Sequence, residues 1–155
     1  MRLTVYTDYA LRLLMYLALK EDRLATINDV AESYGISRNH LLKIVLKLRN
    51  RGLVATTRGR SGGIRLAVAP EEINVGAVVR DVGNDFIVVE CMKATGDGCV
   101  LSPICRLKGV VREALGAYLS VFDKYTLADL VANRQELASV LDAFKLVGSS
   151  VNRAA

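Results

Sequence analysis

The chain of 155 residues is long enough for one domain, or for a small domain with an extension. Its hydrophobic content of 52% argues against disorder, and no apolar run approaches the ~20 residues that a membrane-spanning helix needs. The apolar stretch near the N-terminus follows charged residues and lacks a cleavage site, so we expect a cytoplasmic protein without a signal peptide.

Charge is distributed unevenly along the chain. Residues 1–70 contain twelve Lys and Arg against five Asp and Glu, whereas residues 71–155 contain nine against eleven. Within residues 36–65 there are eight basic side chains and no acidic one. A field of one sign attracts polyanions, so this stretch predicts contact with nucleic acid. The alternative is a solvated basic surface.

Two segments with apolar residues at helical spacing open the chain. In the first, residues 11–19, the start could be capped by Thr7 or Asp8. In the second, Thr26 could be the N-cap, and Asp29 three residues later gives a pattern near that of a capping box. These features predict two helices joined by a short connector.

Gly35 would end the second helix, because glycine tolerates the positive φ of a helix end, and a third helix follows. Ser37 could cap it, and Gly52 would end it. Two helices joined by a tight turn, the second of them basic, are typical of a helix-turn-helix. We expect six of its residues to reach the bases and phosphates of a major groove: Ser37, Arg38, Asn39, His40, Lys43 and Lys47. His40 could also be plain surface.

Two short apolar segments, residues 53–57 and 64–68, predict the strands of a β-hairpin. Its glycine-containing loop would form a wing beside the helix-turn-helix. Arginine on a wing suits the negative potential of a narrow minor groove, so we expect DNA contacts from Arg58, Arg60 and Ser61. The same loop could be only a flexible turn, and the pattern of a nucleotide-binding phosphate loop is absent.

After Pro70 the sequence predicts a short helix at Val75–Val82 and an extended segment at residues 86–89. Residues 104–122 then have a broad apolar stripe over about five helical turns. Such a stripe exceeds what a small winged domain needs to cover, so we interpret this segment as a dimerisation helix. The alternative is a helix folded back on its own domain. Residues 126–131 and 135–141 predict short closing helices.

The chain therefore divides into three expected parts. Residues 1–70 form a winged helix-turn-helix DNA-binding domain, residues 71–145 contain the cysteine loop and the dimerisation helix, and residues 146–155 form a flexible tail. The expected fold class is mostly α with a small β-hairpin wing.

All three cysteines, Cys91, Cys99 and Cys105, lie in one glycine-containing stretch. The absence of a CxxC pair disfavours a dithiol redox motif and a zinc ribbon, and an odd count in a reducing compartment disfavours structural disulfides. Soft thiolates that are one ligand short suit an iron–sulfur cluster completed from elsewhere. A redox-active thiol loop without metal is the competing interpretation.

Over nearly its whole length the chain resembles the Rrf2 family of bacterial transcription regulators. The resemblance is carried by the three spaced cysteines and by MRLTVYTDYALRLLMYLAL, SRNHLLKIV, RGRSGGIRL and YTLADLV. It implies a homodimeric repressor that binds a palindromic operator in double-stranded DNA and is not an enzyme. An iron–sulfur redox enzyme is the alternative from another class, but no nucleotide loop, Ser/His/Asp set or carboxylate pair supports it.

Within the family, the chain is most similar to the branch that senses nitric oxide, and an iron-responsive branch is second. This similarity implies one cluster per subunit, a 4Fe–4S rather than a 2Fe–2S cluster, held by Cys91, Cys99, Cys105 and Asp8 of the partner subunit. Lys108 stands where a cluster-biogenesis branch has histidine, which argues against the two-iron cluster of that branch. Loss or nitrosylation of the cluster would release the operator. Iron or redox sensing, and a metal-free thiol switch, are the alternatives.

Overall fold

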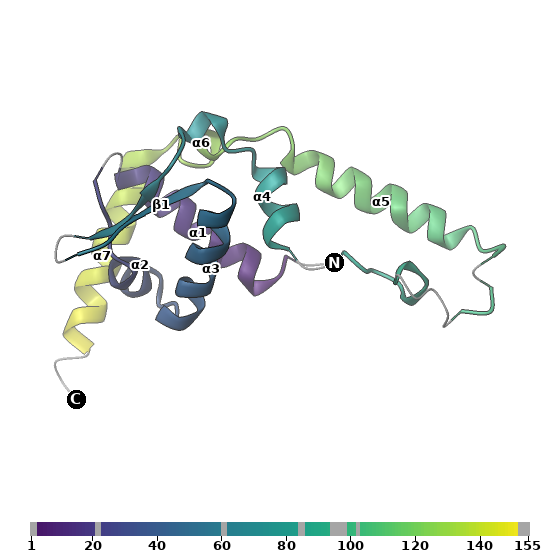
Figure 1. The fold of residues 1–155 in the computed structure, drawn as a ribbon, viewed down its shortest axis with the longest axis horizontal. Coiled ribbons are helices and arrows are strands. Elements are labelled where there is room, and N and C mark those ends of the chain that lie inside the picture. Colours follow the sequence, from purple (N-terminus) through teal and green to yellow (C-terminus); the bar gives the residue numbers. More distant parts are fainter. Residues whose placement is uncertain are drawn as a thin grey trace.

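The computed structural model describes residues 3–20, 23–59, 62–83, 86–93, 99–101 and 103–151. These residues form α-helices, two short 3-10 helices and one antiparallel hairpin (Figure 1). The elements are α1 (Val5–Lys20), α2 (Ile27–Tyr34), α3 (Arg38–Asn50), β1 (Val54–Thr57), β2 (Gly63–Leu66), η1 (Pro70–Glu72), α4 (Val75–Val82), η2 (Glu90–Met92), α5 (Leu107–Phe122), α6 (Leu127–Leu130) and α7 (Arg134–Val151). The expected fold class, mostly α with a β-hairpin wing, is confirmed.

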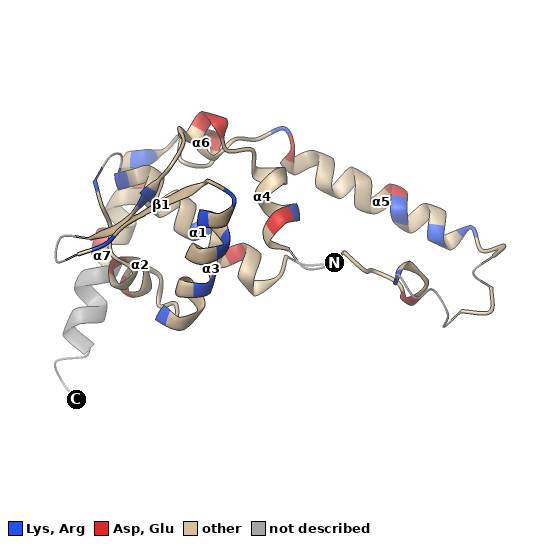
Figure 2. Ribbon diagram, viewed as in Figure 1, with Lys and Arg blue, Asp and Glu red and all other residues tan. Residues whose placement is uncertain are grey.

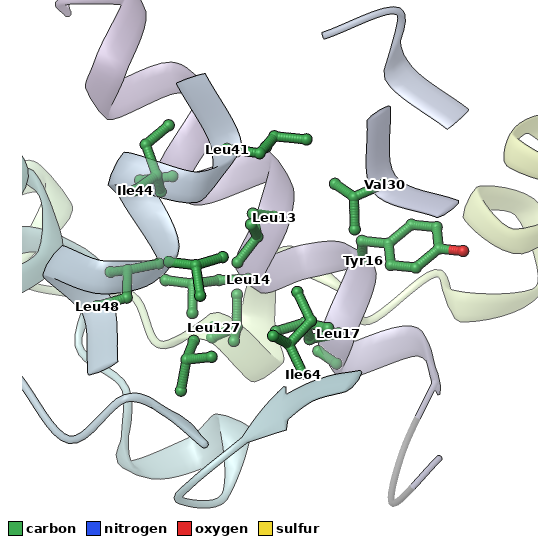
Figure 3. Close-up of a cluster of buried hydrophobic side chains, with 14 of the residues drawn as sticks. Leu13, Leu14, Tyr16, Leu17, Val30, Leu41, Ile44, Leu48, Ile64 and Leu127 are labelled. Atoms are coloured by element: carbon green, nitrogen blue, oxygen red, sulfur yellow. The ribbon is translucent and has the colours of Figure 1, made fainter. Parts of the chain in front are cut away.

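The hydrophobic core surrounds α1, which packs against α3, α4, α6 and β2 (Figure 3). The core side chains labelled in Figure 3 are at most 3% exposed and come from α1, α2, α3, β2 and α6. Figure 3 labels them: Leu13, Leu14, Tyr16, Leu17, Val30, Leu41, Ile44, Leu48, Ile64 and Leu127. Because each buried aliphatic side chain is worth about 1.5–3 kcal/mol, this cluster holds the helix-turn-helix and the hairpin in one unit.

The caps of the first helices agree with the sequence in part. Thr26 and Asp29 form the expected capping box, in which the Asp29 amide donates to the Thr26 hydroxyl at 3.1 Å and the Thr26 amide donates to the Asp29 carboxylate at 2.8 Å. Helix α1 starts earlier than expected, and Thr4 caps it by accepting from the Thr7 amide. The expected cap at Thr7 or Asp8 is therefore wrong. Ser37 occupies the cap position of α3, but its side chain makes no capping hydrogen bond.

The hairpin is joined to the rest of the domain along its second strand. Val54 pairs with Leu66 and Thr57 with Gly63, within a residue or two of the expected strand ends. On the other side of β2, the Ala25 and Ile64 amides donate to each other's carbonyls at 2.9 and 2.7 Å. A Cβ on Gly63 would lie 2.7 Å from the Ala25 carbonyl oxygen, so this close approach requires glycine.

The second half of the chain is less compact. Helix α4 has the expected bounds, residues 86–89 form no strand in the described structure, and α5 begins three residues after Ile104. Helix α5 projects from the rest of the molecule, and none of its side chains, all of which are described, is buried (Figure 1). Helix α7 lies beside α2 and continues to Val151, beyond the expected end at residue 141. None of the described helices is long and apolar enough to cross a membrane.

Candidate functional site

Helix α3 turns one face into the core and the opposite face to solvent. Leu41, Ile44 and Leu48 are fully buried, whereas Asn39 and Lys43 lie exposed on the opposite side. The 3.6-residue period of the helix produces this division, because the buried positions recur every three or four residues. The outer face is therefore free to enter a DNA groove, as the sequence predicts for Asn39 and Lys43.

One flank of α3 is occupied by neighbouring elements. The Lys47 ammonium donates to the Val82 carbonyl at 3.3 Å, and Arg51 pairs with Asp81 at 3.2 Å. Both partners belong to the C-terminal turn of α4, where exposed carbonyls favour cations. The structure thus separates Lys47, which the sequence grouped with Asn39 and Lys43, from the outer face of the helix.

His40 lies on the same flank, toward the start of α1. Its ring centroid is 6.0 Å from that of Tyr6 and 6.2 Å from that of Tyr9, and the imidazole is exposed. Among the described residues it has no neighbouring set of metal ligands. The arrangement leaves His40 at the rim of the outer face, beside aromatic side chains.

The other flank of α3 faces the hairpin across a groove of about 410 Å³. Arg38, Leu42, Leu46 and Arg49 line the groove from α3, and Thr56, Thr57, Gly62 and Gly63 line it from the hairpin. The contacts predicted from the sequence do not include Leu42, Leu46 and Arg49. The available signal was the position of two leucines outside the buried stripe of α3, where they are 42% and 51% exposed.

The described part of the wing has the expected exposed arginine. Arg58 directly follows β1 and is exposed, and Gly59 has a φ of 112°, which side chains with a Cβ rarely adopt. Arg60 and Ser61, the other expected contacts on the wing, lie outside the described residues. Figure 2 shows basic and no acidic residues on α3, consistent with the sequence between residues 36 and 65.

The three cysteines are free thiols that lie before the start of α5. Cys91 is buried in η2, and Cys99 and Cys105 are half-buried. Within the described ranges, no three His, Cys, Asp or Glu side chains come close enough to hold a metal ion. The donor chemistry nevertheless fits an iron–sulfur cluster, because three unpaired thiols lie within fifteen residues and soft thiolates are its usual ligands.

Asp8, the expected fourth ligand, lies in the first turn of α1. Its carboxylate accepts a hydrogen bond from Arg12 Nε at 3.1 Å and is 3.0 Å from Arg12 Nη2. The Arg12 guanidinium is also 6.0 Å from the centre of the Tyr34 ring, and burial raises the pKa of the Tyr34 hydroxyl. The Asp8 side chain is 44% exposed, which leaves its carboxylate accessible to a second molecule.

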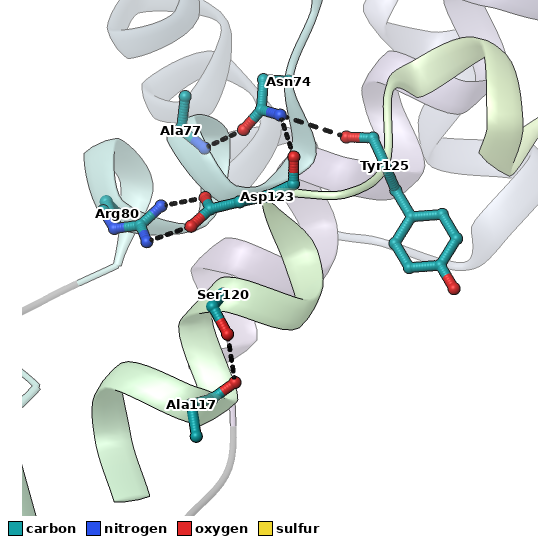
Figure 4. Close-up of polar contacts among 7 residues, drawn as sticks. All are labelled: Asn74, Ala77, Arg80, Ala117, Ser120, Asp123 and Tyr125. Carbon is teal, nitrogen blue, oxygen red and sulfur yellow. Dashed lines mark hydrogen bonds and ion pairs between the residues drawn. The ribbon is translucent and has the colours of Figure 1, made fainter. Parts of the chain in front are cut away.

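A polar junction joins α4 to the end of α5 (Figure 4). Two parallel hydrogen bonds connect the Arg80 guanidinium with the Asp123 carboxylate and hold the pKa of that carboxyl below its usual range. Asn74 donates to the Asp123 carbonyl at 2.8 Å and accepts from the Ala77 amide at 3.0 Å. No sequence pattern predicts this junction, because Arg80 and Asp123 are 43 residues apart in the chain.

Known proteins match this chain over most of its length. The model of the family Rrf2, described as iron-dependent transcriptional regulator, matches residues 3–133. A protein of Halalkalibacterium halodurans named HTH-type transcriptional regulator NsrR is 54% identical over 142 residues, which cover 91% of this chain and 97% of that protein. The Bacillus subtilis protein of the same name is 52% identical, with the same coverage.

Solved structures share the fold. The oxidized form of Staphylococcus aureus CymR superposes with a TM-score of 0.66 and 28% identity, over 84% of this chain and 95% of that one. IscR from T. potens superposes with a TM-score of 0.68 and 24% identity, over 88% and 90%. The similarity thus includes the winged helix-turn-helix and most of the C-terminal half.

Proposed function

The chain belongs to the Rrf2 family of transcriptional regulators, and from that premise we propose that it is a DNA-binding repressor of the NsrR type that senses nitric oxide through an iron–sulfur cluster. The observation that carries the proposal is the set of three free thiols placed before a projecting helix, in a chain about half identical to regulators named NsrR. The winged helix-turn-helix and the segment with the three cysteines would form one switch, in which a change at the cysteines alters DNA binding.

The surface that would contact DNA consists of α3 and the wing. Asn39 and Lys43 on the outer face, with Ser37 and Arg38 at the start of the helix, would contact bases and phosphates of the major groove. Arg58 would follow the adjacent backbone, together with Arg60 and Ser61 of the same loop. His40 would contact a phosphate at the rim, and Lys47 would help to fix α4 instead of binding DNA.

We propose that two copies of the chain pair through α5. Its exposed apolar residues include Leu107, Val110 and Val121, which are 50% to 61% exposed. Half-buried Leu115 and Tyr118 extend this surface along the helix. A helix with this much open apolar surface gains free energy when its twin covers it. A two-fold dimer would present two α3 helices to the half-sites of a palindrome.

Cys91, Cys99 and Cys105 would hold a 4Fe–4S cluster, with Asp8 of the partner subunit as the fourth ligand. Such a cluster would supply iron that can react with nitric oxide, and the Asp8 carboxylate would be a poorer ligand for that iron than the three thiolates. Asp8 would connect the cluster to the DNA-binding helix, because Asp8 lies in α1 and α1 packs directly against α3. Release of Asp8 would shift α1 and so the spacing of the two α3 helices.

The test is the composition and DNA binding of protein purified without oxygen. We expect about four irons and four sulfides per chain, and tight binding to a duplex selected from a randomised pool. Cys99→Ser should lose most of the iron and bind the duplex weakly, while Ser139→Ala, an exposed control on α7, should retain both properties. A wild-type protein without iron would remove the cluster from the account and leave the DNA-binding regulator in place.

A second candidate is a regulator of the same fold that responds to iron supply or to thiol oxidation. Two observations favour it: the matching family model is described as iron-dependent, and one similar structure is of an oxidized form of CymR. Such a protein would release its operator on treatment with a chelator or peroxide and respond weakly to nitric oxide. A metal-free thiol switch would respond to peroxide with no iron bound.

A further inference from the structure

Two exposed leucines lie in the groove between α3 and the wing. Leu42 is 42% and Leu46 51% exposed, and both line the same groove of about 410 Å³. Single exposed apolar residues are common on protein surfaces and need no explanation. This pair differs because both side chains lie in one groove, between the two elements that would read DNA.

The surroundings of the two leucines are basic. Arg38 and Arg49 line the groove beside them, and no acidic residue occurs between residues 36 and 65. A protein partner would leave these guanidinium groups against a surface that must supply several carboxylates. Duplex DNA supplies phosphates on both sides of a groove, so the charges favour DNA as the occupant.

The chemistry of the major groove then selects one base. Each base pair presents hydrogen-bonding groups there, and thymine alone also presents a methyl group. Leucine can make no hydrogen bond, and the thymine methyl is its apolar counterpart. Leu42 and Leu46 are four residues apart, or about 6 Å along the helix axis, which is close to two base-pair steps of about 3.4 Å.

We propose that Leu42 and Leu46 select the operator by contacting thymine methyl groups in the major groove. This inference rests on the proposed DNA-binding function and adds the specificity of the site. Asn39 and Lys43 contact bases and phosphates beside the leucines, and the leucines discriminate thymine from cytosine at up to two positions, about two base-pair steps apart. Selection should therefore enrich thymine at these positions in each half-site.

The test replaces single thymines by deoxyuridine, which removes only the methyl group. The probe is the duplex enriched from a randomised pool, and each substituted duplex is titrated against wild type, Leu42→Ala and Leu46→Ala. In the wild type, deoxyuridine at one or two positions per half-site should weaken binding about fourfold, the size expected for one buried methyl. At those positions the matching alanine variant should bind both duplexes equally.

Controls separate this effect from folding and from general affinity. Val140→Ala removes an exposed apolar side chain on α7 and should retain the wild-type response to deoxyuridine. Leu46→Met keeps an apolar side chain and should retain part of it. Wild-type affinity that no deoxyuridine changes would overturn the inference, as would a loss that persists in both alanine variants. Neither result affects the DNA-binding function, which fails only if no duplex is enriched.

Discussion

Arg80 and Asp123 connect two helices that are separated by the whole cysteine segment. The second of their two hydrogen bonds, from Arg80 Nη2 to Asp123 Oδ2, is 2.7 Å long. Asp123 directly follows α5, and Arg80 lies in α4, whose last turn also holds Lys47 and Arg51. Described contacts thus lead from the helix beside the thiols to the helix that would read DNA.

We expect Asp123→Ala to weaken the response of DNA binding to nitric oxide. Without the carboxylate, α5 can move relative to α4, so a change at the thiols moves α3 less. The measurement is the ratio of operator affinities before and after nitric oxide, which should shrink several-fold while iron content stays normal. Lys124→Ala alters the next residue, which is exposed, and is the matched control. A normal ratio in Asp123→Ala would exclude this route of coupling.

Acid should leave the junction intact until the carboxylate is protonated. The hydrogen bonds from Arg80 lower the pKa of Asp123, so the pairing contributes fully above the usual carboxyl pKa of about 3.9 and is lost as the pH falls through the lowered value. The nitric oxide response of the wild type should therefore be constant between about pH 6 and pH 8 with respect to this pair. Titration of the Asp123 carboxyl carbon by NMR would measure the shift directly.

Gly76→Ala should disrupt the same junction from the other side. A Cβ at this position would overlap Asp123 Oδ1 and lie 2.9 Å from Arg80 Nη1, so the carboxylate must move away. Gly76→Ala and Asp123→Ala both remove the same interaction, the pairing of Arg80 with Asp123. The double variant should therefore lose no more of the nitric oxide response of DNA binding than either single variant. Ala77→Gly is a control for helix propensity in α4, at an exposed position. If the losses of the nitric oxide response add in the double variant, Gly76 acts in another way.

Lys43 and Lys47 should behave differently although both are basic residues on α3. Lys43 is exposed, so Lys43→Ala should reduce the slope of log affinity against log salt by about 0.9. Lys47→Ala should leave the slope unchanged and lower the stability by about 0.5–1.5 kcal/mol, since its hydrogen bond to Val82 is lost. Salt titrations and thermal melts of both variants measure the two effects. Equal slopes for the two variants would contradict the placement of Lys47.

Thr26→Ala should destabilise the domain by about 1 kcal/mol, because it removes the side chain that accepts from the Asp29 amide at the start of α2. Thr26→Ser keeps the hydroxyl and should restore most of the loss. Chemical denaturation of the three proteins gives the comparison. Thr26 also lines the groove beside α3, so DNA binding should be measured at a temperature where all three are folded.

Local signals in the sequence predicted much of the fold. Gly35 has the positive φ of 63° expected at a helix end, and Thr26 forms its capping box, because both depend on residues within one turn. The bounds of α4 could be predicted because its apolar residues recur at helical spacing and are buried on one side of the helix. These features need no knowledge of distant parts of the chain.

Contacts between distant segments could not be predicted in the same way. Lys47 had the helical spacing of a groove residue, yet the C-terminal turn of α4, thirty-five residues later, provides its partner. No sequence pattern indicated that Arg80 pairs with Asp123, since an ion pair needs two charges and a fold that brings them together. For the candidate metal ligands, the sequence identifies the thiols but not their assembly, which the described residues of one chain do not contain.

The most direct test of the account is a titration of anaerobic protein with nitric oxide that records cluster absorbance and operator binding in the same sample. If the account is right, both signals fall together, and Asp8→Ala keeps thiolate-bound iron but separates the loss of absorbance from the loss of binding. Asp142→Ala, an exposed carboxylate on α7, should behave as wild type. Operator binding that persists after the absorbance is bleached would contradict the central claim.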